Sequence, residues 1–275
     1  MCASRGETLA WARGLIPLSE ARLLMQHILG VSRVALMAHP ELPMTDSKIA
    51  DFQALLARRR AGEPVAYLLG EREFYGRSFQ VGPDVLIPRP ETELLVELAL
   101  ERAGNGSRIL DLGTGSGAVA VTLALESPGS EVTATDLSPG ALAIAGANAE
   151  TLGAKLNFLE GSWFEPLPAD RSFDLIVSNP PYVAPGDPHL SQGDLRFEPS
   201  SALVGKADGL GDIRLIVSGA ANHLAPGGWL LFEHGYDQGP ACRNMLSVAG
   251  FTQVQSWCDL AGIERVSGGH LISKR

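Results

Sequence analysis

Cysteine and histidine are sparse in this chain, and neither follows a metal-binding spacing. The three cysteines are Cys2, Cys242 and Cys258, and no two of them form a C-x-x-C pair. They therefore indicate neither a disulfide framework nor a zinc site. The six histidines form no H-x-x-x-H or H-E-x-x-H pattern. We expect no bound metal ion.

Positive charge is also in short supply. The chain carries 22 lysines and arginines against 31 acidic residues, a net charge of −9. Non-specific binding of nucleic acid depends on basic side chains that neutralise phosphates. The composition therefore disfavours a nucleic-acid-binding protein.

Long apolar runs are missing as well. No run of about 18 uninterrupted apolar residues occurs, so we expect no membrane span. The first residues, MCASRGETLAWARGLIP, have neither a continuous apolar core nor an A-x-A cleavage pattern. We therefore expect no signal peptide and a cytoplasmic location. Apolar residues still make up 45% of the chain, which is typical of a globular protein.

The charge is divided unevenly along the 275 residues. Residues 1–88 carry a net charge of +1 and residues 89–275 a net charge of −10. A chain of this length has one or two domains. We expect a helical N-terminal domain over residues 1–70, a β-hairpin connector over 71–88 and a larger domain over 89–275.

Local patterns support the first two of these regions. Apolar residues recur at helical spacing in EARLLMQHIL, which Ser19 is placed to cap and Gly30 to end. A second helix is expected to begin after Thr45 or Asp46 and to run to Gly62. The segment EREFYGRSFQVGPDVLIP is rich in aromatic and β-branched residues, Gly and Pro, which favours a hairpin.

Strand and helix patterns alternate through the third region. Strands are expected at 108–113, 131–136, 155–161, 173–183 and 228–235. Helices are expected at 91–103, 116–127, 138–153, 212–224 and 237–249, with Ser138 and Pro139 at the start of one of them. This alternation predicts an α/β fold with a parallel, doubly wound sheet.

A glycine-rich turn follows the first of these strands. It reads Asp111-Leu112-Gly113-Thr114-Gly115-Ser116-Gly117 and opens a helix. Glycines allow a ligand to approach the backbone closely. The G-x-G-x-G spacing is not that of dinucleotide binders, and no P-loop lysine follows. Asp136 ends the next strand, where it can accept ribose hydroxyls or cap the following helix. Together the two elements resemble the cofactor site of class I S-adenosylmethionine-dependent methyltransferases.

The sequence Asn179-Pro180-Pro181-Tyr182 directly follows the strand FDLIVS. An amide or exocyclic amine nitrogen is a poor nucleophile because its lone pair is delocalised. The Asn179 side-chain oxygen and the Pro180 carbonyl can each accept an N–H bond, which aligns such a nitrogen for attack. Tyr182 offers a flat face to a planar group. The tetrapeptide is typical of methyltransferases that act on nitrogen in a planar system.

Further segments resemble the HemK/PrmC family, the bacterial glutamine methyltransferases of peptide chain release factors. They are GEPVAYLLGEREFYG, VLIPRPETELLVE, GSWF, LRFEPSSALVG and LFEHGYDQG. The resemblance implies a small helical bundle joined by a β-hairpin to a Rossmann-like methyltransferase domain. The implied reaction is methylation of the side-chain amide nitrogen (N5) of the glutamine in the Gly-Gly-Gln motif of class-one release factors, with the helical bundle recognising the substrate.

The resemblance also implies roles for individual residues. Residues 113–117 would pack against the methionine part of S-adenosylmethionine, Asp136 would hold its ribose and Trp163 would lie against its adenine. Asn179, which would lie beside both cofactor and substrate, and Pro180 and Tyr182 are the candidate catalytic residues. The implied cofactor-binding residues are Gly113, Thr114, Gly115, Ser116, Gly117, Asp136, Trp163 and Asn179. The implied substrate-binding residues are Asn179, Pro180, Pro181 and Tyr182, with Arg89 to Glu93 nearby.

Some questions stay open at this level. Many family members carry an acid where this chain has Ser162, so the contact to the adenine amine is undecided. A glutamine methyltransferase of a ribosomal protein is the nearest alternative, and an adenine-amine methyltransferase of nucleic acid is a more distant one. The long polar segment 184–198 is expected to help enclose the substrate, and His234 to be a structural group near the site.

Overall fold

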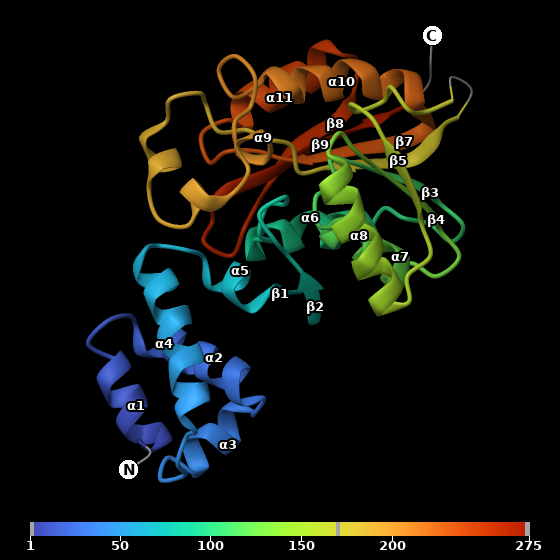
Figure 1. Ribbon diagram of the computed structural model, residues 1–275. Coiled ribbons are helices and arrows are strands. Elements are labelled where there is room, and N and C mark those ends of the chain that lie inside the picture. Colours follow the sequence, from blue (N-terminus) through green and yellow to red (C-terminus); the bar gives the residue numbers. More distant parts are fainter. Residues whose placement is uncertain (1–2, 169–170, 273–275) are drawn as a thin grey trace. The chain divides into compact units, whose positions relative to one another are not determined.

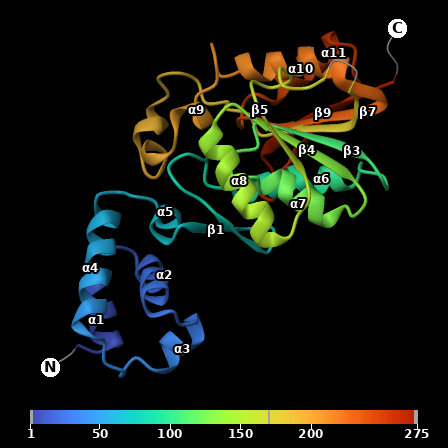
Figure 2. The ribbon, with the colours of Figure 1, turned by 45° about the vertical axis from the view of Figure 1, so that its right-hand side comes forward.

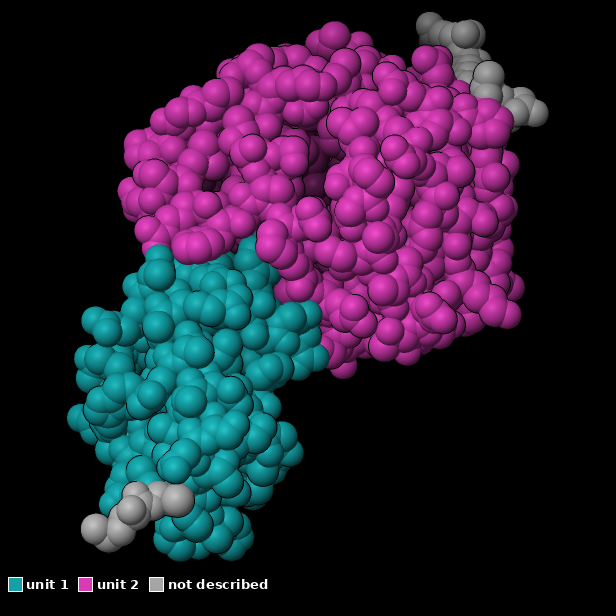
Figure 3. Space-filling view, in the orientation of Figure 1, with its two compact units in different colours: residues 1–71 teal, residues 72–275 magenta. Residues whose placement is uncertain are grey.

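The computed structural model describes residues 3–168 and 171–272 (Figure 1). It divides into two compact units, residues 1–71 and residues 72–275 (Figure 3). Each buried apolar cluster found among the described residues lies within one of the two units. Each unit therefore has a hydrophobic core of its own.

The first unit is built from five helices, α1 (Arg5–Ala12), α2 (Leu18–Leu29), α3 (Arg33–Ala38), α4 (Asp46–Arg60) and α5 (Val65–Leu69). Thr45 caps α4 by accepting a hydrogen bond from the Lys48 N–H, and Gly30 ends α2 in the left-handed conformation at φ 65°. The expected cap at Ser19 is wrong, because the N-cap of α2 is Pro17, two residues earlier. The core of the unit contains Leu24, Met25, Leu36, Met44, Phe52 and Leu56.

A hairpin of strands β1 (Glu71–Phe74) and β2 (Arg77–Gln80) follows. Its two-residue loop, Tyr75–Gly76, has positive φ at both positions, 51° and 73°, as a type I′ turn requires. Phe74 and Phe79 are buried and pack edge to face, with ring centroids 6.0 Å apart.

The second unit contains a seven-stranded sheet in the order β5-β4-β3-β6-β7-β9-β8. Its strands are β3 (Arg108–Leu112), β4 (Glu131–Asp136), β5 (Asn157–Glu160), β6 (Phe173–Ser178), β7 (Leu224–Glu233), β8 (Thr252–Cys258) and β9 (Glu264–Leu271). The five strands from β5 to β7 are parallel, as expected, whereas β9 runs antiparallel to both β7 and β8. The link from β8 to β9 spans only residues 259–263, too few for a parallel crossover.

Helices cover both faces of this sheet (Figure 1 and Figure 2). One face packs against α6 (Glu93–Leu100), α7 (Ala118–Glu126) and α8 (Pro139–Leu152), and the other against α10 (Gly211–His223) and α11 (Gly239–Val248). Successive residues of β3 serve the two cores in turn: Ile109 packs in the first and Leu110 in the second. The fold is a Rossmann-like α/β domain, as the family resemblance implied.

The order of the strands determines where a ligand can bind. Strand β3 is central: the chain continues from it to β4 and β5 on one side and to β6 and β7 on the other. In open α/β sheets, the crevice at the carboxyl ends of the strands where the order reverses is the usual ligand site. The second unit also contains the short helices η1 (Pro90–Thr92), η2 (Pro188–Ser191), η3 (Leu195–Phe197) and α9 (Ser200–Leu203). Among the described residues, no helix is both long and apolar enough to cross a membrane.

Candidate functional site

A cavity of about 500 Å³ opens at the carboxyl ends of β3, β4 and β6, within the second unit. Its wall combines residues from the glycine-rich turn, the end of β4, the loop after β5 and the loop after β6. Of the residues predicted from the sequence, the cavity is lined by Gly113, Thr114, Gly115, Ser116, Asp136, Trp163, Asn179 and Pro181. Three others, Gly117, Pro180 and Tyr182, are not among the residues that line it.

The glycine-rich turn presents its backbone to the cavity. Gly113 has φ 72°, and a Cβ added there would lie 3.1 Å from the Trp163 ring. Gly115 has φ 56°, and an added Cβ would meet no atom within 4 Å, so this position opens onto free space. A Cβ on Gly117 would instead press on Ala145 of α8 at 3.0 Å. Gly117 therefore allows close packing of two helices.

Asp111 is a buried carboxyl group on the cavity wall. Its Oδ2 accepts a hydrogen bond from the Thr114 hydroxyl at 2.7 Å, and its side chain is 1% exposed. Burial raises the pKa of Asp111 to about 7, and the nearby charge of Asp136 acts in the same direction. A cationic group bound in the cavity would favour the ionised form of this carboxyl.

Asp136 ends β4 with its carboxylate between the glycine-rich turn and α8. Its Oδ2 accepts a hydrogen bond from the Gly115 N–H at 2.8 Å, and its Oδ1 accepts one from the Ser138 N–H at 2.9 Å. A carboxylate oxygen can accept more than one hydrogen bond, so these contacts orient the group and leave acceptor capacity. The next residue, Leu137, also lines the cavity and is 71% exposed.

Trp163 holds an unusual backbone conformation. Its φ of 47° lies in the left-handed region, which bulky residues rarely adopt. The Thr135 hydroxyl donates a hydrogen bond to its carbonyl oxygen at 3.1 Å, and its ring lies over Gly113. Backbone strain of this kind is often found where function needs one orientation of a side chain. Ser162 lines the same part of the cavity.

The Asn-Pro-Pro-Tyr loop is held by several hydrogen bonds. Asn179 Nδ2 donates to Thr92 Oγ1 at 3.2 Å, the Tyr182 hydroxyl donates to Glu233 Oε1 at 3.0 Å, and Gln238 Nε2 donates to the Tyr182 carbonyl at 3.0 Å. Burial, followed by the charge of Glu233, raises the pKa of Tyr182. In this structure Tyr182 thus anchors the loop, while its predicted contact with a substrate stays a prediction.

Two buried acids near the site had no predicted role. Glu198 is 6% exposed; it forms an ion pair with Arg89, which lines the cavity, and accepts a hydrogen bond from the Ile87 N–H at 3.1 Å. Glu233 is 2% exposed. Burial raises the pKa of Glu233, against the hydrogen bonds from Thr92 and Tyr182. A charged residue that ends an apolar strand, as Glu233 does, signals a buried partner, although the sequence does not say which.

The remaining expectations concern the segment after the loop and His234. No residue of 184–198 is among those that line the cavity, but Ser201, Ala202 and Val204 are. Val204 forms a parallel bridge with Val183, which attaches this stretch to the Asn-Pro-Pro-Tyr loop. The ring of His234 is buried, with Ser267 at its Nε2 and the Gly235 carbonyl at its Nδ1, both 2.8 Å away. Those contacts make it a structural group, as expected. Within the described residues, no group of three or more potential metal ligands was found.

The comparison with solved structures agrees with this fold. The chain resembles a 16S rRNA N2 G1207 methyltransferase of T. Thermophilus, solved in complex with AdoMet and guanosine, with a TM-score of 0.55 at 24% identity. The match covers 73% of this chain and 49% of that one. A methyltransferase from Pyrococcus furiosus also gives a TM-score of 0.55, at 18% identity over 80% of this chain and 98% of that one.

Sequence comparison identifies the family. Two family models match: the PrmC N-terminal domain at residues 8–70 and the methyltransferase small domain at residues 90–194. The release factor glutamine methyltransferase of Bordetella pertussis is 55% identical, covering 93% of this chain and 96% of that protein. The Neisseria gonorrhoeae protein of the same name is 53% identical, covering 92% and 93%. This chain belongs to the release factor glutamine methyltransferase family.

Proposed function

We propose that this protein transfers a methyl group from S-adenosylmethionine to the side-chain amide nitrogen of the glutamine in the Gly-Gly-Gln motif of class-one release factors. The observation that carries the proposal is the position of Asn179. It lies on the wall of the same cavity as the glycine-rich turn and Asp136. Such a cavity can hold a cofactor beside an acceptor for a substrate N–H. We also propose a cytoplasmic location, because the proposed substrates act in translation termination.

The cavity suits the proposed cofactor in size and charge. Pockets for small molecules commonly measure about 300–1,000 Å³, and this one measures about 500 Å³. S-adenosylmethionine carries a sulfonium and an amino group against a single carboxylate. The two carboxyl groups on the wall, Asp111 and Asp136, complement that excess of positive charge.

We assign the cofactor contacts as follows. The backbone at Gly113 and Gly115 receives the methionine part, because no side chain intervenes there. Asp136 accepts the ribose hydroxyls with the capacity that its two backbone hydrogen bonds leave. The Trp163 ring and Leu137 offer apolar surface to the adenine. Ser162 Oγ can accept a hydrogen bond from the adenine amine.

S-adenosylmethionine, when bound, supplies an electrophilic methyl group on its sulfonium. Asn179 Oδ1 and the Pro180 carbonyl each accept one N–H of the substrate amide, which holds the nitrogen in line for attack. Pro180 and Pro181 fix their backbone φ angles and keep the acceptors in place. The nitrogen loses its proton once it carries the new methyl group, and water can take that proton.

The choice of substrate rests on the family. The relatives that match nearly the whole chain are named for release factors. The net charge of −10 on residues 89–275 disfavours a nucleic-acid substrate. We assign recognition of the release factor outside the pocket to the helical N-terminal unit.

A methyl-transfer assay tests the proposal. The purified chain is offered a release factor, ribosomal proteins and nucleic acid in parallel, with labelled S-adenosylmethionine, and the product is mapped by peptide mass spectrometry. We expect a single methyl group on the Gly-Gly-Gln glutamine. Transfer to a ribosomal protein or to nucleic acid alone would overturn the choice of substrate.

Replacement of the proposed acceptor separates chemistry from cofactor binding. The Asn179→Ala variant should lose turnover and keep its affinity for S-adenosylmethionine, because Asn179 serves the substrate amide. Calorimetry of cofactor binding and the methyl-transfer assay measure the two effects. A loss of cofactor affinity as large as the loss of turnover would contradict the assignment.

A further inference from the structure

We propose that Glu233 is a positioning residue for methyl transfer: acting through Thr92, its carboxylate keeps the Asn179 carboxamide turned so that Oδ1 faces the substrate. This inference rests on the function proposed for Asn179. Glu233 is the last residue of β7, whereas the Asn-Pro-Pro-Tyr loop follows β6.

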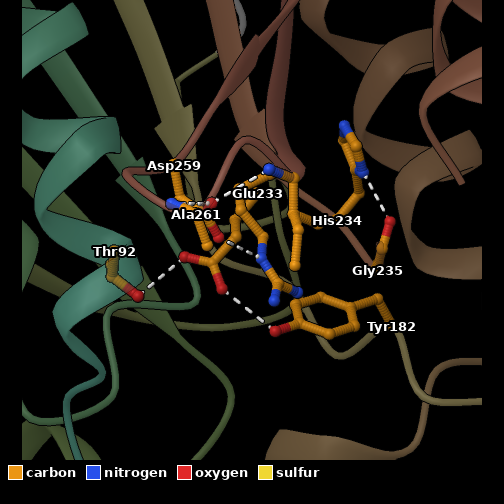
Figure 4. Close-up of polar contacts among 9 residues, drawn as sticks. Thr92, Tyr182, Glu233, His234, Gly235, Asp259 and Ala261 are labelled. Atoms are coloured by element: carbon orange, nitrogen blue, oxygen red, sulfur yellow. Dashed lines mark hydrogen bonds and ion pairs between the residues drawn. The ribbon is translucent and has the colours of Figure 1, made fainter. Parts of the chain in front are cut away.

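The three side chains form a continuous chain of hydrogen bonds. Glu233 Oε2 accepts a hydrogen bond from the Thr92 hydroxyl at 2.7 Å, as Figure 4 shows. Thr92 Oγ1 in turn accepts from Asn179 Nδ2 at 3.2 Å. Glu233 and Thr92 are 2% and 4% exposed, so water has little access to replace these partners.

The direction of each hydrogen bond follows from the chemistry of the groups. The hydrogen bonds from Thr92 and Tyr182 and the positive charge of Arg265 favour the ionised form of Glu233 against the effect of burial. An ionised carboxylate can only accept, and a threonine hydroxyl has a single hydrogen. That hydrogen is given to Glu233, so Thr92 Oγ1 can only accept from its other neighbour. Asn179 must therefore present its NH₂ group to Thr92. Its Oδ1 is then directed away from Thr92 and is available to a substrate N–H.

The opposite orientation of the carboxamide would be unfavourable. A flip of the amide would bring Asn179 Oδ1 against Thr92 Oγ1 with no hydrogen between the two oxygens. Buried polar groups left without a partner cost about 1–3 kcal/mol. The two orientations of an amide have nearly the same shape, so hydrogen bonding rather than packing selects between them.

Glu233 also holds the other end of the loop. The Tyr182 hydroxyl donates to Glu233 Oε1 at 3.0 Å (Figure 4). The Glu233 carboxylate thus holds Tyr182 by a direct hydrogen bond, and it holds Asn179 indirectly, through Thr92. This arrangement suits a loop whose two substrate acceptors need a constant separation.

The isosteric variant Glu233→Gln tests the proposal. Within the part of the chain that the structure describes, the side chain at position 233 is the acceptor found for the Tyr182 hydroxyl. The glutamine oxygen should therefore face Tyr182, and its NH₂ group should face Thr92. Thr92 would then accept from the glutamine and donate to Asn179 Oδ1, which turns the carboxamide the wrong way. We expect kcat on a full-length release factor to fall by about tenfold or more, with cofactor affinity and melting temperature close to those of the wild type.

A purely structural role predicts the opposite pattern. Glutamine fills the same space and keeps the hydroxyls of Thr92 and Tyr182 hydrogen-bonded. If Glu233 only stabilised the fold, the protein would therefore tolerate this substitution. Wild-type kcat in Glu233→Gln would overturn the inference. A lowered kcat together with a clearly lowered melting temperature would also overturn it, because loss of folded structure would then explain the lost activity.

Substitutions of Thr92 provide a second, independent test. Thr92→Val keeps the shape and removes the hydroxyl, so kcat should fall, whereas Thr92→Ser should restore it. Thr122→Val is a matched control, because Thr122 is also buried and its hydroxyl donates to the Ala118 carbonyl of its own helix. Full activity of Thr92→Val would overturn the inference. Full activity of Asn179→Ala would instead overturn the proposed role of Asn179.

Discussion

At the scale of single residues, the cavity combines acidic groups whose surroundings differ. Asp136 is held by two backbone N–H donors at the end of β4. Asp111 is fully enclosed and bonded to the Thr114 hydroxyl. Enclosure without a cationic partner disfavours the charged form of a carboxyl group. Asp111 therefore lowers the stability of the ligand-free protein at any pH at which its carboxyl group is ionised.

The stability of the protein should depend on pH through Asp111. Its folded-state pKa of about 7 exceeds the ordinary value of 3.8, so between these values the folded state binds the proton more tightly than the unfolded state. The free energy of unfolding should therefore fall as pH rises from about 4 to about 7, by at most about 4 kcal/mol.

Denaturant titrations of the wild type and of Asp111→Asn measure this effect. The variant lacks the titrating group, and its amide oxygen can still accept from Thr114. We expect the stability of the wild type relative to Asp111→Asn to decline between about pH 4 and about pH 7 and to level off above that. Parallel pH profiles for the two proteins would show that Asp111 does not titrate in this range.

The residue scale also shows what local sequence can reveal. Ser138 and Pro139 were predicted to start a helix, and both do, because capping depends on neighbours in the chain. The partners of Asn179 and Tyr182 were not predicted. Thr92 and Glu233 are separated by 141 residues, and only the folded sheet brings them together.

At the scale of elements, helix α8 connects the hairpin to the glycine-rich turn. Asn148 is 1% exposed. Its Nδ2 donates to the Gln80 and Ser116 carbonyls at 3.0 and 2.8 Å, and its Oδ1 accepts from the Gln80 N–H at 2.7 Å. A single side chain thus pairs a strand edge with the loop that forms part of the cavity wall.

The Asn148→Ala variant should therefore be clearly destabilised. Of the three backbone groups that would lose their partner, the Ser116 carbonyl is buried, and a loss of that kind costs about 1–3 kcal/mol when nothing replaces it. We expect the free energy of unfolding to fall by about 1–3 kcal/mol in denaturant titrations. The same change at the exposed Asn157 is the control and should have little effect. Equal stability of the two variants would refute a structural role for Asn148.

The alternation of strands and helices predicted most of the elements in the second unit. The five strands from β5 to β7 follow the expected parallel arrangement. The antiparallel direction of β9 was not foreseen, because the sequence pattern of a strand is the same in either direction. Direction depends on the length of the connection and on the neighbouring strand.

At the scale of the whole molecule, the chain has two units with separate cores. Every described residue that lines the cavity belongs to the second unit. The second unit should therefore bind the cofactor without the first. Recognition of the release factor by the first unit is a proposal that deletion can test.

A chain lacking residues 1–70 should keep the cofactor affinity of the full protein. Its KM for a full-length release factor should rise by about tenfold or more, because the contacts of the first unit with the substrate are lost. A loss of about 1.4 kcal/mol of binding free energy corresponds to a factor of ten. Calorimetry with S-adenosylmethionine and steady-state kinetics measure the two quantities. An unchanged KM would remove substrate recognition from the first unit.

The sequence alone determined the class of fold, the family and the place of the site. Strand-end residues such as Asp136 and Asn179 reach the same edge of a parallel sheet wherever their strands lie in it, so that edge follows from local pattern. The strand order, with β4 and β6 on either side of β3, brings the two residues to one cavity. The tertiary structure decided which groups orient them. Glu198 beside Arg89, and Glu233 beside Thr92 and Tyr182, come together only when distant segments pack. Hydrogen bonds act over about 3 Å, and no local pattern specifies positions to that accuracy.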